Sequence, residues 1–314
     1  MASVQPDISV VIPVFNEAPN LKELHERLVN VMEPLGRSFE IVAVDDGSSD
    51  GSLELLNEIR AVDPRLRIVR LSRNFGQTPA MYAGFANARG RVVVSIDADL
   101  QNPPEEIPKL IAKLDEGYDV VQGWREFRQD AVFRKAASRI LNGIVSRATG
   151  VKIRDLGCGL KAYRREILDY MTQFTHHTRY VPAEFVWLGA TIAEVNVEHR
   201  ERASGDSKYG IFTLLRLNFD MIASVTSAPL RIIGLVGWLL SIVGFGMGLR
   251  IFTLRLMYGN FDPFATVAAI FFTLVGVQMI ATGVMCEYMS RIFVETQNKP
   301  YYIIREVLEE KEPP

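Results

Sequence analysis

The feature that most constrains the fold is an alternation of short apolar, β-branched runs with helical patterns through most of the chain before residue 200. Each run has the length and the Val/Ile content of a strand that is covered on both faces. This alternation predicts an α/β domain with a mostly parallel sheet. The expected strands are 8–14, 40–44, 67–71, 92–96, 119–122 and 191–197, and the expected helices are 20–32, 52–61, 78–88, 105–116 and 131–149.

Two apolar runs without charged residues, 232–249 and 264–286, dominate the later part of the chain. Each is close to the roughly 20 residues that a membrane-spanning helix needs. Lysine and arginine are denser outside the pair than in the connecting stretch 250–263, which predicts that both termini are cytoplasmic in a multi-pass protein of the plasma (inner) membrane. The alternative is a buried helical hairpin in a water-soluble protein.

Four parts are therefore expected. Residues 1–210 form a cytoplasmic catalytic domain, 211–230 an amphipathic helix in the membrane interface, 231–289 two transmembrane helices, and 290–314 a cytoplasmic tail. The interfacial helix could equally be an ordinary helix that faces a core. Glycines in the apolar runs permit close helix packing within one chain or in a homo-oligomer.

Composition excludes some classes of function. The 314 residues carry 35 basic and 37 acidic side chains, for a net charge of −2, whereas nucleic-acid-binding proteins usually have a basic excess. The two cysteines, Cys158 and Cys286, are far apart and form no CxxC pair, so neither a disulfide framework nor a thiolate metal site is expected.

Acidic residues follow three of the expected strands: Glu17 after the first, Asp45 and Asp46 after the second, and Asp97 and Asp99 after the fourth. In an open parallel sheet, ligands bind beyond the carboxyl ends of the strands. Carboxylates that converge there repel one another unless a cation joins them, and Mg²⁺ commonly bridges carboxylates to substrate phosphates. We therefore expect these side chains to meet around a divalent ion at a diphosphate site. Helix capping is the alternative role for a lone Asp-x-Asp pair.

Four motifs resemble one enzyme family. They are Val10-Val11-Ile12-Pro13-Val14-Phe15-Asn16-Glu17, Val44-Asp45-Asp46-Gly47-Ser48-Ser49-Asp50, Arg73-Asn74-Phe75-Gly76 and Asp97-Ala98-Asp99-Leu100-Gln101-Asn102-Pro103-Pro104. Together they resemble family-two glycosyltransferases of the GT-A type, a Rossmann-like α/β fold. More narrowly, they resemble the polyprenyl-phosphate glycosyltransferases, which are relatives of dolichol-phosphate mannosyltransferase. The resemblance extends over essentially the whole chain, and it includes the two apolar runs, which bacterial bactoprenol glucosyltransferases also have.

The resemblance implies roles for the motif residues. The nucleotide sugar would contact Pro13, Val14, Glu17, Asp46, Asp97 and Asp99. A Mg²⁺ or Mn²⁺ ion would be held by Asp99, with Gln101 as a second ligand, and would neutralise charge on the departing diphosphate.

A basic loop precedes the apolar runs and contains Arg202, Ser207 and Lys208. Arginine grips phosphate in a bidentate manner and lysine adds a point charge. The resemblance implies that these residues close on the donor diphosphate, with Arg202 catalytic. The alternative is a juxtamembrane flank that only orients the membrane helices.

A phosphate acceptor requires its own cations, and the resemblance implies that Arg125, Arg134 and Ser138 bind it. The alternative is a solvated basic face. The same resemblance makes Asp155 the catalytic carboxylate. Because a phosphate monoester is largely deprotonated at neutral pH, Asp155 would act either as a base or as a group that positions the acceptor.

The expected reaction is an inverting transfer of a hexose to polyprenyl (undecaprenyl) phosphate at the cytoplasmic face of the membrane. UDP-glucose is the favoured donor and GDP-mannose the alternative. Two other functions are weighed. A non-catalytic sensor or scaffold would be expected to lose Asp99, Asp155 or Arg202, and a processive polysaccharide synthase would need more membrane spans.

Overall fold

The computed structural model describes residues 5–124, 158–173, 185, 188–198, 246, 249–250, 253, 257, 263–297 and 299–309. The chain divides into two compact units. One comprises Met1–Thr213 with Pro300–Pro314, and the other comprises Leu214–Lys299.

An eight-stranded mixed sheet organises the first unit, in the order β7-β5-β6-β4-β1-β2-β3-β8. Strands β1 to β4 run parallel, because β1 pairs in parallel with β2 and β4, and β2 pairs in parallel with β3. β6 is antiparallel to β4 and β5, and β8 is antiparallel to β3. The bounds are β1 Ile8–Val14, β2 Phe39–Asp45, β3 Leu66–Leu71, β4 Val92–Ser95, β5 Val120–Trp124, β6 Lys161–Arg164, β7 Ile192–Asn196 and β8 Ile304–Leu308.

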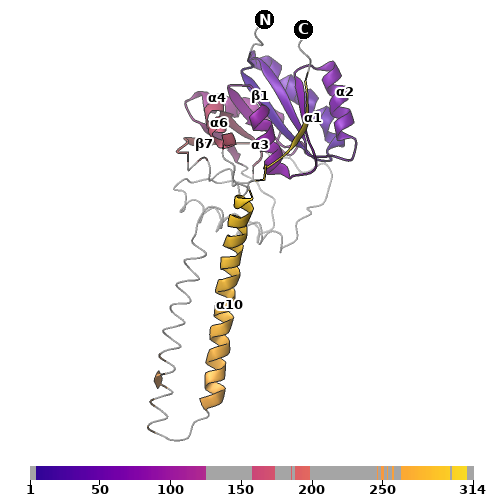
Figure 1. Cartoon of the computed structure of the whole chain (residues 1–314). Coiled ribbons are helices and arrows are strands. Elements are labelled where there is room, and N and C mark those ends of the chain that lie inside the picture. Colours follow the sequence, from indigo (N-terminus) through magenta and orange to yellow (C-terminus); the bar gives the residue numbers. More distant parts are fainter. Residues whose placement is uncertain are drawn as a thin grey trace. The chain divides into compact units, whose positions relative to one another are not determined.

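Helices cover both faces of this sheet, so each central strand buries both rows of its side chains (Figure 1). Val10 and Ile12 of β1 pack into one core cluster with apolar residues of α1, α2 and α4, whereas Val11 packs into the other with α3 and α6. The bounds are α1 Ala18–Met32, α2 Ser52–Val62, α3 Gln77–Asn87, α4 Ile107–Asp115 and α6 Arg165–Gln173, with short 3₁₀ turns at Glu33–Leu35 and Pro104–Glu106. The α/β architecture predicted from the sequence is confirmed.

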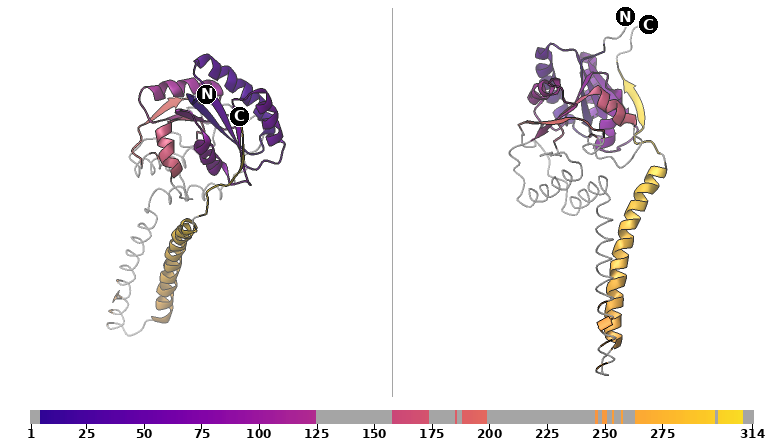
Figure 2. Two further views of the ribbon diagram at one scale, coloured as in Figure 1. Left: turned by 45° about the horizontal axis from the view of Figure 1, so that its top comes forward. Right: turned by 90° about the vertical axis from the view of Figure 1, so that its left-hand side faces the viewer.

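The elements that sequence patterns did not predict are β6, α6 and β8. β6 and β8 form the antiparallel pairs of the sheet, which agrees with the prediction of a mostly, not entirely, parallel sheet. The largest difference concerns the expected C-terminal tail 290–314, because part of it forms β8 at the edge of the sheet (yellow in Figure 2).

Ion pairs fasten β8 to the amino-terminal end of the sheet. Arg67 of β3 donates to Glu309 at 2.9 Å, to Glu40 at 3.1 Å and to the carbonyl of Asn87 at 2.7 Å. Arg89 also donates to Glu309, at 2.8 Å. Glu40 is 6% exposed, so its charge depends on these protein donors rather than on water.

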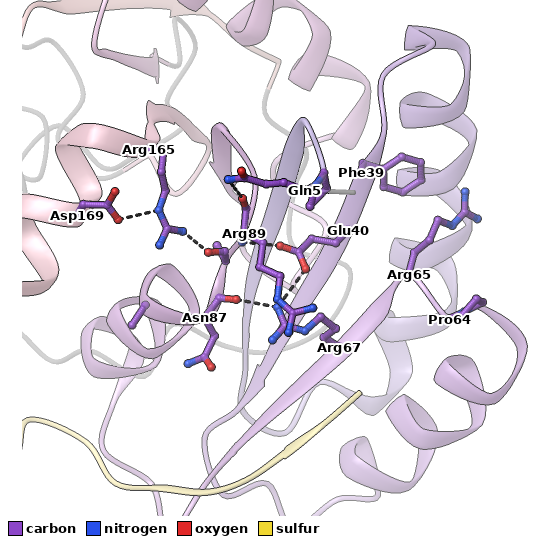
Figure 3. Close-up of a pocket in the computed structure, with 13 residues that line it drawn as sticks. Gln5, Phe39, Glu40, Pro64, Arg65, Arg67, Asn87, Arg89, Arg165 and Asp169 are labelled. Atoms are coloured by element: carbon purple, nitrogen blue, oxygen red, sulfur yellow. Dashed lines mark hydrogen bonds and ion pairs between the residues drawn. The ribbon is translucent and has the colours of Figure 1, made fainter. Parts of the chain in front are cut away.

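A cavity of about 950 Å³ lies at this end of the sheet, and none of the predicted site residues lines it (Figure 3). Its arginines are paired with carboxylates: Arg65 with Asp63, Arg67 with Glu40, Arg89 with Glu309 and Arg165 with Asp169. These ion pairs indicate that the residues of the cavity wall have a structural role, which is to hold this end of the sheet together.

We expect Glu40→Gln to lower the free energy of unfolding by about 3 kcal/mol, because it removes the buried one of the two carboxylates that pair with Arg67. Glu40 also accepts hydrogen bonds from the Ser9 hydroxyl and the Arg89 amide, both at 2.6 Å. Chemical denaturation of the purified protein measures the change. Glu58→Gln is the control, because its pair with Lys22 is long, at 3.9 Å, and exposed. Equal effects of the two substitutions would contradict the prediction.

The second unit contains α10, a helix of 34 residues from Pro263 to Thr296 that includes the predicted span 264–286. In the parts of the chain that the structure describes, no helix combines the length and the apolarity that a membrane crossing requires. The two predicted crossings are therefore not confirmed. Most of 232–249, and all of the predicted interfacial helix 211–230, lie outside the described residues.

Candidate active site

The carboxyl end of β2 carries a buried acidic pair, Asp45 and Asp46, that are 1% and 2% exposed. Asp46 accepts hydrogen bonds from the backbone amides of Phe75 and Gly76, at 2.7 and 2.8 Å. Burial raises the pKa of the Asp46 carboxyl above its usual value, and the two amides oppose that shift. Asp46 therefore fixes the 73–76 turn, a structural role that was not expected from the sequence.

Hydrogen bonds join the end of β1 to the segment that follows β2. The backbone amide of Asp46 donates to the carbonyl of Val14 at 2.9 Å, and the amide of Glu17 donates to the Ser52 hydroxyl at 3.0 Å. The Glu17 carboxylate accepts a 2.6 Å hydrogen bond from Asn20. Pro13, Val14, Glu17 and Asp46 thus lie at or just beyond two adjoining strand ends, and their role in a nucleotide pocket stays a prediction.

Asp97 and Asp99 lie in the turn after β4, both half-buried on either side of the buried Ala98. Asp97 accepts a 2.7 Å hydrogen bond from the side-chain amide of Gln77. Asp99 accepts from the backbone amide of Gln101 at 3.1 Å across Leu100, which has a φ of +60°. This is an Asx-type turn, and it fixes the direction of the Asp99 carboxylate.

The start of β6 closes against Asp97. A β-carbon added at Gly159 would lie 2.0 Å from Oδ2 of Asp97, so only glycine leaves room for that carboxylate. The hydroxyl of Ser95 donates to the carbonyl of Gly159 at 2.9 Å. The chain after the predicted catalytic Asp155 therefore passes directly beside the Asp97–Asp99 turn.

The expected meeting of three acidic clusters around one ion is not found. Across the described ranges, no three His, Cys, Asp or Glu side chains lie close enough together to hold a metal ion between them. Asp46 is turned toward the backbone amides of Phe75 and Gly76 instead. The pair Asp97 and Asp99 still fits a magnesium-type site, because Mg²⁺ commonly takes one or two carboxylates and completes its shell with substrate phosphates and water.

Several predicted site residues lie outside the described residues: Arg125, Arg134, Ser138, Asp155, Arg202, Ser207 and Lys208. Their roles remain predictions. Conversely, Gln77 and Gly159 lie at the site although the sequence motifs gave neither a role. The glycines that flank Cys158 in 155–161 were a signal of a close backbone approach at this position.

Comparison with known proteins shows which family has this sequence and fold. The model of the family described as "Glycosyl transferase family 2" matches residues 9–171. An undecaprenyl-phosphate 4-deoxy-4-formamido-L-arabinose transferase of Proteus mirabilis is 41% identical over 310 residues, which cover 98% of this chain and 95% of that protein. A Salmonella typhimurium protein of the same name is 41% identical, covering 96% of this chain and 93% of that protein.

The described fold also resembles a solved enzyme. A crystal structure of glucosyl-3-phosphoglycerate synthase from Mycobacterium tuberculosis, in complex with Mn²⁺, UDP and glucosyl-3-phosphoglycerate, has a TM-score of 0.50 and 25% identity. The match covers 70% of this chain and 78% of that one. The chain is therefore an enzyme that belongs to glycosyl transferase family 2 and, within it, to the polyprenyl-phosphate glycosyltransferases.

Proposed function

We propose that the chain transfers a sugar from a UDP-sugar to polyprenyl phosphate, with inversion at the anomeric carbon. The observation that carries this proposal is the turn after β4, which presents Asp97 and Asp99 at the carboxyl edge of the parallel strands, the edge at which Asp46 follows β2. That edge is where open α/β sheets bind nucleotides. The relatives named as undecaprenyl-phosphate sugar transferases support the lipid acceptor.

In this proposal, Asp99 and Gln101 hold the divalent ion, and Pro13, Val14, Glu17, Asp46 and Asp97 line the nucleotide side. Bound Mg²⁺ or Mn²⁺ would stabilise the negative charge that grows on the leaving diphosphate. Asp99 is fixed in direction by its hydrogen bond from Gln101, so it needs little reorganisation when the ion binds.

The acceptor side rests on residues assigned by family resemblance. Arg125, Arg134 and Ser138 would bind the acceptor phosphate, and Arg202, Ser207 and Lys208 would close on the donor diphosphate. Asp155 would orient the acceptor or accept its proton. The chain places Asp155 four residues before Gly159, which lies against Asp97, so a role near the transferred sugar is consistent with the described geometry.

Two sugars are candidates. Glucose follows from the resemblance to bactoprenol glucosyltransferases. The second candidate is 4-deoxy-4-formamido-L-arabinose, because the names of the relatives contain this sugar.

A lipid acceptor implies work at a bilayer. Large apolar side chains of α10 are exposed: Phe264, Phe271, Met279, Ile280 and Phe293 are between 60% and 84% exposed. Such a surface is unusual for a soluble helix and suits contact with lipid. We propose that this helix, together with the apolar run 232–249, anchors the enzyme in the membrane with the sheet on the cytoplasmic side.

The decisive experiment incubates the purified protein with undecaprenyl phosphate, Mg²⁺ or Mn²⁺ and one nucleotide sugar at a time: UDP-glucose, UDP-4-deoxy-4-formamido-L-arabinose or GDP-mannose. We expect release of UDP and a glycolipid detected by mass spectrometry for one UDP-sugar. The product would be absent without the metal ion. Transfer without any lipid phosphate, or from GDP-mannose alone, would contradict the proposal.

A further inference from the structure

The side chain of Gln77 links two parts of the site. Gln77 is the first residue of α3, and its amide nitrogen donates to Oδ1 of Asp97 at 2.7 Å. This hydrogen bond restricts the rotation of the Asp97 carboxylate. The geometry of Asp97 therefore depends on where α3 begins.

The beginning of α3 is fixed in turn by the end of β2. Asp46 binds the amides of Phe75 and Gly76, the two residues that precede Gln77. Gly47, with a φ of +73°, allows a close approach between these segments, because a β-carbon there would lie 2.8 Å from the amide nitrogen of Asn74. Asp46, which is 2% exposed, is thus a buried residue whose carboxylate holds this turn in place.

We propose that Gln77 is a positioning residue that orients Asp97 toward the donor diphosphate, and that Asp46 acts through the 73–76 turn to place Gln77. This inference rests on the proposed function, because it assumes that Asp97 faces the nucleotide. The backbone at Gly159 also lies close against this carboxylate, because a β-carbon there would lie 2.0 Å from Oδ2 of Asp97. The carboxylate is therefore held by an amide donor and packed against backbone.

The first test compares Gln77→Met, which keeps the length of the side chain without its donor, with the wild type. We expect kcat/KM for the nucleotide sugar to fall about tenfold to thirtyfold, the usual effect of losing a hydrogen bond to a charged group. The KM of the lipid acceptor stays unchanged. Gln5→Met is the matched control, because its amide also makes an exposed 2.7 Å hydrogen bond, to the carbonyl of Arg89, and both residues line the cavity at the amino-terminal end of the sheet.

A double-mutant cycle with Asp97→Ala, which removes the acceptor of the Gln77 hydrogen bond, completes the design. If Gln77 acts through Asp97, Gln77→Met changes kcat/KM less than about twofold in the Asp97→Ala background. An equal effect in both backgrounds would overturn the inference. The affinity for UDP with Mn²⁺, measured by calorimetry, provides an independent readout. If wild type binds UDP but transfers no sugar to the lipid, the proposed function fails while the role of Gln77 is still decided by the affinities.

Discussion

Asp99→Asn is expected to reduce sugar transfer about 1,000-fold, the largest effect of any single substitution proposed for this enzyme. Asparagine keeps the size of the side chain and its ability to accept the hydrogen bond from the Gln101 amide. The Asx-type turn therefore survives, whereas the negative charge that would bind the divalent ion is lost. The rate is measured as UDP release with undecaprenyl phosphate and saturating Mg²⁺.

The control is Asp115→Asn. Asp115 is an exposed aspartate that accepts a 3.0 Å hydrogen bond from Arg37, so the same chemical change there removes only a surface ion pair. We expect Asp115→Asn to retain wild-type turnover. Electron paramagnetic resonance of Mn²⁺ gives the second readout, because Asp99→Asn should weaken Mn²⁺ binding in the presence of UDP. Turnover by Asp99→Asn within tenfold of wild type would show that Asp99 is not a metal ligand.

The strands and helices that the sequence predicted share a local signature. β1, β2 and β3 are rich in Val, Ile and Leu and are buried on both faces. In the helices between them, apolar residues recur at helical spacing. Because these signals lie within each segment, they can be recognised without knowing the partner of the segment. The predicted ends of these elements lie within two residues of the observed ones, and those of β1 coincide with them.

β6 and β8 could not be recognised in this way. β6 is only Lys161–Arg164, and the three central residues of β8, Arg305, Glu306 and Val307, are all exposed. What makes β8 a strand is its distant partner β3, including the 2.8 Å pair between Arg70 and Glu306. A cross-strand pair between residues so far apart in the chain leaves no local pattern.

The same difference between local and distant signals explains what the sequence could and could not predict about the site. Strand-end position correctly brought Glu17, Asp46 and Asp97 to one edge of the sheet. It did not reveal the direction of each carboxylate, because that depends on donors from other segments. Asp46 is oriented by the amides of Phe75 and Gly76, and Asp97 by Gln77. The expected three-cluster metal cage failed for this reason.

Gly159→Ala is expected to reduce kcat/KM about 100-fold with little loss of stability. The added methyl group would lie 2.0 Å from Oδ2 and 2.7 Å from Oδ1 of Asp97. The clashing atoms belong to the end of a side chain, so Asp97 rotates away rather than the backbone moving. Rotation breaks its hydrogen bond from Gln77, and a misplacement of about 1 Å at a reacting centre costs on the order of 100-fold.

Gly123→Ala distinguishes this effect from general crowding. A β-carbon at Gly123 would lie 2.9 Å from a methyl group of Val197 and 3.1 Å from Sγ of Cys158, without touching Asp97. Overpacking of this kind lowers the free energy of unfolding by about 1–3 kcal/mol. We expect Gly123→Ala to lose stability and retain most of its kcat/KM, and Gly159→Ala to do the reverse. Thermal unfolding and UDP-release kinetics, measured on both variants, decide between them, since a parallel loss in the two would mean that Gly159 matters only for packing.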